Sequence, residues 1–184
     1  MDSTVLLHLT CKYLTPSLVT ALHVNHGISS EADLWEHHAE QQGLELSVNF
    51  ESYRVSCLAR SNREALAREA RYSVFEQRLA QDDILLLAHH ADDQVETVLY
   101  NLLRGSGNTG MSGIPVMRDL GIGRILRPLL SVTKSQIKRY AKSHQLTWIE
   151  DESNSDTSFD RNYLRQKVIP LLAERWRGHQ SRIA

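Results

Sequence analysis

Apolar and polar positions alternate along the chain with two periods, one typical of helices and the other typical of strands. Segments whose apolar residues lie three or four apart are predicted to be helices. They cover residues 5–14, 30–42, 64–81, 95–103, 133–144 and, with a break near Pro170, 161–177. Shorter β-rich runs are predicted to be strands, at residues 18–24, 44–50, 84–87 and 146–149. Because strands and helices take turns, we expect βαβ units with a mostly parallel sheet between layers of helices.

Turn and capping residues predict where these segments begin and end. Gly43 is expected to stop the second helix. Two sequences with the form of a capping box, Ser61–Glu64 and Thr133–Gln136, are expected to open later helices. Asp92 is the predicted N-cap of the helix that follows the strand at 84–87. The glycine-rich stretch Gly105–Gly113 is predicted to be a mobile loop at the active site.

Composition narrows the class of protein. The chain has 184 residues, 41% hydrophobic and 23% charged, which suits one ordinary globular domain. No apolar run approaches the roughly 20 residues that span a bilayer, and no secretory signal is present, so no membrane partner is expected. The two cysteines, Cys11 and Cys57, form no CxxC pair, which favours a reduced, cytoplasmic setting without a zinc site.

Charge is unevenly placed although the formal net charge is only −1. Lysines and arginines follow one another in 134–142 with no acidic residue between them, and basic residues crowd 161–182. Such local basic surfaces permit a nucleic-acid partner. On charge alone, solvated helix faces are the more common explanation, and both interpretations stay open.

The run His89–Thr97 carries the densest candidate chemistry, and it follows the apolar strand at 84–87 directly. Ligands of open α/β sheets bind at the carboxyl ends of strands, so we expect the site at this turn. Asp93 and Glu96 are three residues apart and share one helix face. Two carboxylates on one face suit a cationic guest, and metal binding and plain solvated charge are the alternatives.

The first predicted helix begins almost at residue 1, with Asp2-Ser3-Thr4. We therefore expect that the buried strand and loop with which doubly wound domains normally open are missing. Asp2 and Ser3 either cap this helix or meet a phosphate at its N-terminus, and the residues alone favour capping. At the end of the next strand, Gly27 is expected to take a positive φ beside His26.

Together these segments resemble the N-terminal catalytic domain of the tRNA(Ile)-lysidine synthetase family, which belongs to the PP-loop ATP pyrophosphatases. The matching pieces are Met1–His8, His23–Ile28, Glu64–Tyr72, His89–Thr97, Leu103–Gly107, Arg127–Leu130, Trp148–Asn154 and Asp160–Arg165. The resemblance implies a Rossmann-like α/β fold of the adenine nucleotide alpha hydrolase-like type, with three layers, a mostly parallel sheet and the first strand missing. It implies a PP-loop ATP-binding catalytic domain at 1–160 that lacks the Ser-Gly-Gly of the loop. Residues 161–184 would form a helix leading toward an absent tRNA-binding region.

The resemblance also implies an activity: ATP-dependent ligation of lysine to C2 of the wobble cytidine in the CAU anticodon of tRNA(Ile), through an adenylated cytidine. The implied catalytic group has four members. Asp93 and Glu96 would hold the lysine, His89 would lie near the adenylate, and Arg161 would bind the lysine α-carboxylate. The implied ATP-binding residues are Asp2, Ser3, His26 and Arg71, with Asp2 also a ligand of Mg²⁺. The implied tRNA contacts are Arg68, Arg104 and Arg165.

The expected substrates and cofactors are therefore tRNA(Ile), free L-lysine, ATP and Mg²⁺, and homodimer formation is left open. Two alternatives remain at this point. One is a truncated remnant that folds but catalyses nothing, because the Ser-Gly-Gly part of the phosphate cradle is absent. The other is a sister PP-loop enzyme such as a tRNA thiolase, which Cys11 and Cys57 are poorly placed to serve.

Overall fold

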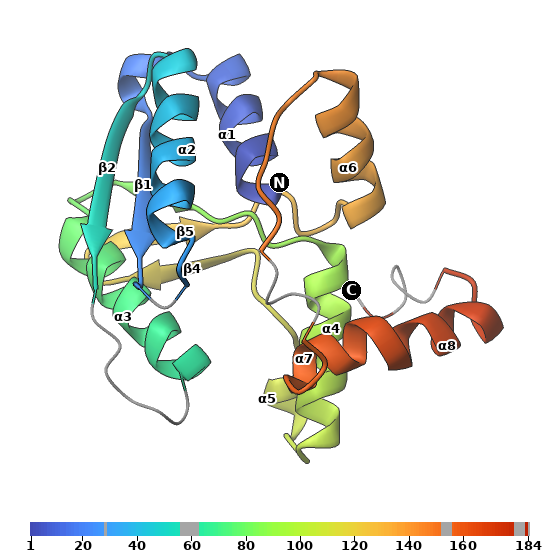
Figure 1. The fold of residues 1–184 in the computed structure, drawn as a ribbon. Helices are drawn as coiled ribbons and strands as arrows, with labels where there is room; N and C mark the ends of the chain where they lie inside the picture. Colours follow the sequence, from blue (N-terminus) through green and yellow to red (C-terminus); the bar gives the residue numbers. More distant parts are fainter. Residues whose placement is uncertain (28, 56–62, 152–155, 179–182, 184) are drawn as a thin grey trace.

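Helices and strands follow one another along the chain in the computed structural model, which describes residues 1–27, 29–55, 63–151, 156–178 and 183 (Figure 1). The longer helices are α1 (Asp2–Tyr13), α2 (Ala32–Glu45), α3 (Arg63–Arg78), α4 (Ala91–Leu103) and α6 (Lys134–Ser143). Shorter helical segments are η1 (Pro16–Leu18), α5 (Asn108–Met111), α7 (Asp160–Tyr163), the π-helical η3 (Leu164–Val168) and α8 (Ile169–Arg175). The strands are β1 (Thr20–Asn25), β2 (Asn49–Arg54), β3 (Ile84–Leu86), β4 (Met117–Leu120) and β5 (Gly123–Leu126).

The strands pair in two groups, and parallel pairing occurs in both. β1 and β2 form a parallel pair, in which Thr20 lies opposite Asn49 and Asn25 opposite Arg54. In the other sheet β5 lies between β3, to which it is parallel, and β4, to which it is antiparallel. The helix α2 connects β1 to β2 as the crossover that a parallel pair requires. The predicted α/β architecture with a mostly parallel sheet is thus confirmed, although the described strands form two sheets rather than one.

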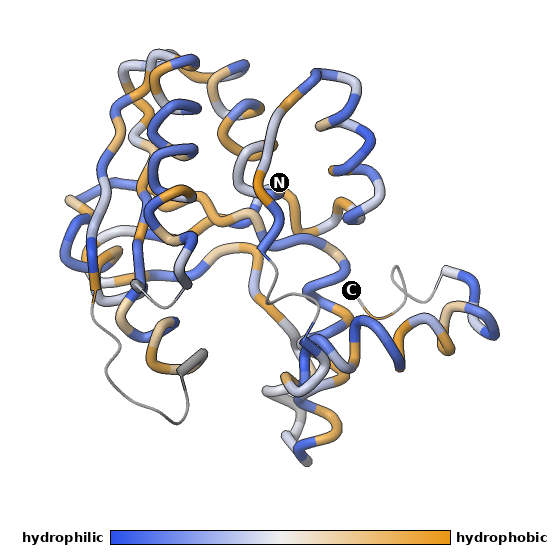
Figure 2. The backbone as a smooth tube through the Cα atoms, viewed as in Figure 1, coloured by the Kyte–Doolittle hydropathy of each residue, from blue (hydrophilic) through white to orange (hydrophobic). Residues whose placement is uncertain are grey.

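Two apolar clusters hold helices to the sheets on different sides. One joins α1 to α6 and centres on Val5, Leu129 and Ile137, with β3 contributing Leu86. The other packs Phe75 of α3 against Ile125 of β5 and against apolar side chains of β1. In Figure 2 β3 is hydrophobic, whereas α6 is largely hydrophilic apart from inward residues such as Ile137 and Ala141. The sheets therefore form a middle layer between α1 and α6 on one side and α3 on the other.

The helix α2 corrects one predicted boundary, because it continues through Gly43 to Glu45. A Cβ placed at Gly43 would lie 3.3 Å from the Phe50 Cβ, so this glycine serves close packing between α2 and β2 rather than a helix stop. The following strand begins at Asn49, later than the predicted residue 44. Tertiary packing here overrides the local signal that glycine gives.

The second half of the chain contains two further differences. The hairpin of β4 and β5 was not predicted, because charged and polar residues interrupt the apolar pattern of β4. The predicted strand at 146–149 is wrong: these residues are not in a strand, and Leu146 and Trp148 instead pack against the α1–α6 cluster. The predicted loop Gly105–Gly113 contains the short helix α5. The capping box predicted at Ser61–Glu64 involves Ser61, which lies outside the described residues, whereas the one at Thr133–Gln136 is confirmed at the start of α6.

Candidate active site

The start of α4 is organised by a histidine that the sequence patterns did not single out as a cap. His90, and not the predicted Asp92, is the N-cap of α4. The His90 Nδ1 accepts a hydrogen bond of 3.4 Å from the Asp93 amide, and the Asp93 Oδ2 accepts one of 2.8 Å from the His90 amide. An imidazole nitrogen can accept a hydrogen bond from an unpaired backbone N–H at a helix start, as a serine or aspartate oxygen does. In the neutral ring the proton then lies on Nε2.

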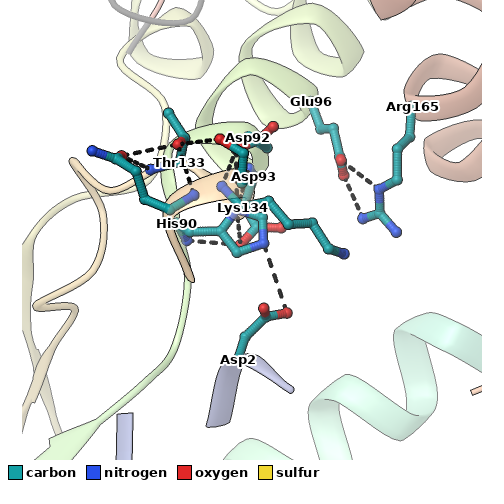
Figure 3. A network of polar contacts seen from close by, with 10 residues as sticks. Asp2, His90, Asp92, Asp93, Glu96, Thr133, Lys134 and Arg165 are labelled. Atoms are coloured by element: carbon teal, nitrogen blue, oxygen red, sulfur yellow. Dashed lines mark hydrogen bonds and ion pairs between the residues drawn. The ribbon is translucent and has the colours of Figure 1, made fainter. Parts of the chain in front are cut away.

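The Nε2 side of His90 faces the first turn of α1. Asp2 Oδ2 lies 3.8 Å from this nitrogen, so residues 88 apart in the sequence meet at one place (Figure 3). Asp2 makes no side-chain capping bond in α1, whose N-cap is Met1. Its other oxygen, Oδ1, is buried and has no hydrogen-bond partner. A buried, unpartnered carboxylate oxygen is costly unless a ligand or cation satisfies it.

Asp92 and Thr133 connect α4 to α6. Asp92 Oδ2 accepts a 2.8 Å hydrogen bond from the Lys134 amide, the first residue of α6 (Figure 3). Thr133 Oγ1 accepts from the Gln136 amide at 3.3 Å and completes the capping box. Asp92 therefore joins two helix N-termini, while Asp93 contacts the His90 amide and lies near enough to His89 to influence its pKa.

His89 lies in a positively charged environment. The Arg127 Nε donates to the His89 Nδ1 at 3.3 Å, and Arg127 is only 2% exposed. Burial lowers the pKa of His89 to about 4; Asp93 opposes this shift, while Arg127, Arg68 and Arg161 add to it. His89 is consequently neutral near pH 7, where it can donate through Nε2 but carries no charge.

Glu96 is paired with an arginine from the C-terminal segment. Arg165 Nε and Nη2 donate to the two Glu96 carboxylate oxygens at 2.6 and 2.8 Å, in the bidentate geometry that guanidinium groups favour (Figure 3). The Glu96 side chain is 2% exposed and that of Arg165 32%. Hydrogen bonding to Glu96 raises the pKa of Arg165 further above its ordinary value. The structure thus brings Arg165 to Glu96, whereas Arg161 lies with its Cζ 5.8 Å from the centre of the Tyr100 ring.

A second group of predicted residues lies at the carboxyl end of β1. Arg71 of α3 donates from Nε to the His26 Nε2 at 3.4 Å, and the His26 Nδ1 is buried without a partner. Burial lowers the pKa of His26, and Arg71 and His23 lower it further. Gly27 has φ +61°, which confirms the predicted positive φ. Ser3, by contrast, is exposed on α1.

A cavity of about 260 Å³ opens beside this strand end, between β1, β2 and the start of α2. Polar side chains line it: Asn25 donates from Nδ2 to Asp33 Oδ1 at 3.2 Å, and Arg54 Nη2 donates to the same oxygen at 2.9 Å. Asn25 is 4% exposed and also accepts from the Gly27 amide at 2.9 Å. The carboxyl ends of β1 and β2 therefore carry a polar cavity, separate from the α4 turn.

Among the described residues, no group of three or more His, Cys, Asp or Glu side chains is arranged to hold a metal ion. Mg²⁺ is often bound through one or two carboxylates, with phosphate and water oxygens completing its shell. The unpartnered Asp2 Oδ1 fits that incomplete kind of site.

Comparisons with known proteins place this geometry in a family. A family model described as the PP-loop domain matches residues 1–172. Curated proteins called tRNA(Ile)-lysidine synthase are 46% identical over 179 residues in Pseudomonas fluorescens, 45% over 181 residues in Legionella pneumophila (strain Lens) and 47% over 181 residues in Proteus mirabilis. They align with 96%, 97% and 96% of this chain and with 40%, 42% and 41% of their own lengths. The chain thus spans about two fifths of the length of these relatives.

A solved structure supports the fold assignment. The U34-tRNA thiolase NcsA from Methanococcus maripaludis, solved with its [4Fe-4S] cluster, superposes with a TM-score of 0.77 at 15% sequence identity. The alignment covers 99% of this chain and 66% of the thiolase chain. At this identity the likeness shows a shared fold.

Proposed function

The chain belongs to the PP-loop domain family, and on that premise we propose that it forms the ATP-dependent catalytic part of a tRNA(Ile)-lysidine synthase. One observation carries the proposal: α1 and the His89–Thr97 turn meet, so that Asp2 faces His90 beside the carboxylates of α4. Asp2, the carboxylate proposed to act at the nucleotide, then lies beside Asp93, the carboxylate proposed to bind lysine. A ligase that joins these two substrates needs both groups in one site. The names of the relatives support the same reaction.

ATP would lie between the start of α1 and the end of β1. Helix N-termini attract phosphate, so Ser3 and the first amides of α1 would meet the triphosphate. Arg71, held by His26, would add a positive charge from α3. Mg²⁺, bound by Asp2 Oδ1, would offset phosphate charge. We place the nucleoside toward the polar cavity at the ends of β1 and β2.

The lysine would bind on the α4 face. Asp93 has one oxygen committed to the His90 amide, which leaves the other for the ε-ammonium group. Glu96 is charge-paired with Arg165, so it contributes to lysine binding only as that pair loosens or shares its oxygens. Arg161 would hold the lysine α-carboxylate, and neutral His89 would donate to an acceptor on the adenylated base.

The reaction would proceed in two balanced steps. The cytidine O2 attacks the α-phosphorus of ATP and pyrophosphate leaves, which forms an adenylated base. The lysine Nε, after losing a proton to Asp93 or to solvent, attacks C2, and AMP leaves with the O2 atom. The cytosine must be unstacked to enter, and Arg68, Arg104 and Arg165 are the proposed contacts with the tRNA around it.

A direct test is ligation of labelled lysine to a tRNA(Ile) transcript with a CAU anticodon. We expect Asp93→Asn to keep the bond to the His90 amide but to raise the lysine KM by about tenfold or more, because one charge contact is lost. The matched control is Asp119→Asn, which removes an exposed carboxylate on β4. If Asp93→Asn leaves the lysine KM of ligation unchanged, Asp93 does not bind the lysine. A folded chain that gives neither lysidine nor tRNA-dependent pyrophosphate release would favour the non-catalytic alternative.

Assembly and location follow from the same proposal. In the described part of the chain, no helix has both the length and the apolar composition that a membrane crossing requires. We propose that the protein works in the cytoplasm, where its tRNA substrate is found. We also keep homodimer formation as a proposal, which light scattering of the purified chain would test.

A further inference from the structure

Two tyrosines beside the site are each flanked by two guanidinium groups. The Cζ atoms of Arg68 and Arg118 lie 4.9 and 5.1 Å from the centre of the Tyr72 ring. Those of Arg104 and Arg161 lie 5.3 and 5.8 Å from the centre of the Tyr100 ring. At these distances the ring quadrupole attracts the cation and restrains a flexible side chain. Both phenol oxygens add a bond, accepting from Arg68 Nη2 at 3.3 Å and from Arg104 Nη1 at 3.1 Å.

Sheet register explains why Arg118 faces Tyr72. Arg118 of β4 lies directly opposite Ile125 of β5, and Ile125 is buried against α3. Side chains of opposed residues point to the same face, so Arg118 must lie on the α3 side. Arg127 follows Ile125 by two residues and shares this face. The neighbouring pair, Asp119 and Arg124, points to the other face, where the two form an ion pair at 3.8 Å.

Arg127 completes a cationic cluster whose arginines form no ion pair within the described part of the protein. It is 2% exposed, and it donates to neutral acceptors, the His89 Nδ1 at 3.3 Å and the Pro115 carbonyl at 2.7 Å. Across residues 1–27, 29–55, 63–151, 156–178 and 183, no carboxylate forms an ion pair with Arg68, Arg104, Arg118, Arg127 or Arg161. A buried guanidinium normally finds an anion, and no described carboxylate forms an ion pair with Arg127.

The two clusters converge on His89. Arg127 and Arg68 from one side and Arg161 from the other all disfavour its protonated form. On the Tyr72 side, burial raises the pKa of the phenol, but Arg68, Arg118 and Arg127 together hold it below its ordinary value. Asp93 is the carboxylate that opposes these arginines at His89. His89 therefore lies close enough to Arg127, Arg68 and Arg161 to be influenced by all three, and Arg127 contacts it directly.

We propose that Arg68 and Arg118 on Tyr72, Arg104 on Tyr100, and Arg127 between them bind the phosphodiester backbone of a single-stranded nucleic-acid segment that crosses His89, while Arg161 stays with the lysine α-carboxylate. The inference rests on the proposed function, since it specifies how the nucleic-acid substrate is held. Guanidinium forks fixed on aromatic rings present N–H donors to phosphates without further loss of side-chain entropy. These arginines come from α3, β4, the end of β5 and the end of α4, which suits an extended polyanion better than one compact triphosphate. Positive grooves with interleaved aromatic rings are typical of surfaces that bind single strands.

The test measures binding of the whole chain to a fluorescein-labelled oligouridine of about ten nucleotides, within the usual site size, by anisotropy over a series of KCl concentrations. We expect Arg118→Gln to weaken binding about three- to tenfold at low salt and to reduce the slope of log K against log[KCl] by roughly 0.7, the loss of one phosphate contact. Arg104→Gln should act similarly through the other cluster. Arg124→Gln is the matched control, because Arg124 lies on the same hairpin but on the opposite face, paired with Asp119.

The outcomes separate this inference from the proposed function, because no ATP or lysine is present. Oligouridine that does not bind, or that binds equally to Arg118→Gln, Arg104→Gln and the unchanged chain, would overturn the inference even if lysidine is formed. Equal losses in Arg118→Gln and Arg124→Gln would also overturn it. A companion titration with ATP identifies the source of the phosphate: if Arg118→Gln weakens ATP binding and leaves RNA binding intact, the cluster serves the nucleotide. Normal, arginine-dependent RNA binding without lysidine formation would instead count against the proposed function alone.

Discussion

At the residue scale, neighbouring side chains in the His89–Thr97 run have different tasks because their surroundings differ. His90 caps α4 with Nδ1, Asp92 holds the first amide of α6, and Glu96 is paired with Arg165. Asp93 keeps its Oδ1 and His89 its Nε2 outside the hydrogen bonds described above, and the buried Thr97 Oγ1 has no hydrogen-bond partner. Two histidines and three carboxylates in one short run are thus not equivalent site residues.

His89 leads to a prediction about pH. Its pKa falls from 6.5 to about 4 in the folded protein, so between these values the unfolded chain binds more protons and stability decreases on acidification. From pH 7 to pH 5 this group should cost roughly 1–2 kcal/mol. Urea denaturation at both pH values should show that His89→Gln, which can still accept from Arg127, loses less stability than the unchanged chain. Equal losses would mean that His89 is not held neutral by its surroundings.

At the element scale, α4 fixes the glycine-rich connection that follows it. The buried Gln94 accepts from the Ile114 amide at 2.5 Å and donates to the Ile114 carbonyl at 2.9 Å. Asn101 Nδ2 donates to the Gly110 carbonyl at 2.7 Å. These side-chain bonds satisfy backbone N–H and C=O groups of the connection between α4 and β4 that no helix or strand pairs. The connection is therefore anchored to α4 at two places, which periodicity alone did not predict.

Gly113 is the residue on which this anchoring depends. It has φ +69°, and a Cβ there would lie 2.6 Å from the Gln94 Oε1. We expect Gly113→Ala to lower the free energy of unfolding by about 2 kcal/mol, from backbone strain and a disturbed Gln94 contact. Gly107→Ala is the control, since Gly107 has φ −66° and a methyl group there would meet no heavy atom within 4 Å. Chemical denaturation of both variants measures the difference, and equal effects would contradict the role of Gly113.

At the scale of the whole molecule, packed helices join parts of the chain that are distant in sequence. α3 packs against β5 and against β1, so it links the two sheets, while α6 is held to α1. The segment from α7 to α8 crosses the lower part of α4 in Figure 1, and the Glu96–Arg165 pair joins it there. The PP-loop domain match runs to residue 172 and so includes this pair.

This ion pair should contribute to the attachment of the C-terminal segment. Glu96→Gln leaves a partly exposed guanidinium without its carboxylate, and we expect it to lower the free energy of unfolding by about 2 kcal/mol, less than for a fully buried pair. Arg175→Gln on α8, an exposed residue, is the control and should be nearly neutral. Urea denaturation followed by tryptophan fluorescence measures both. Stability unaffected by Glu96→Gln would show that apolar contacts alone hold the segment.

The sequence by itself determined the alternation of helices and strands, the capping box at Thr133 and the turn at which histidines and carboxylates gather between β3 and α4. These features depend on period, on local hydrogen bonding and on the direction of a buried strand, all of which act over a few residues. Only the tertiary structure decided that α2 continues through Gly43, which packs against Phe50, and that Asp2 lies beside His90. It also decided that Arg165 pairs with Glu96, and that Arg118 and Arg68 both contact the Tyr72 ring. Each of those contacts joins separate elements, and the register and packing of those elements, rather than any local pattern, set which side chains meet.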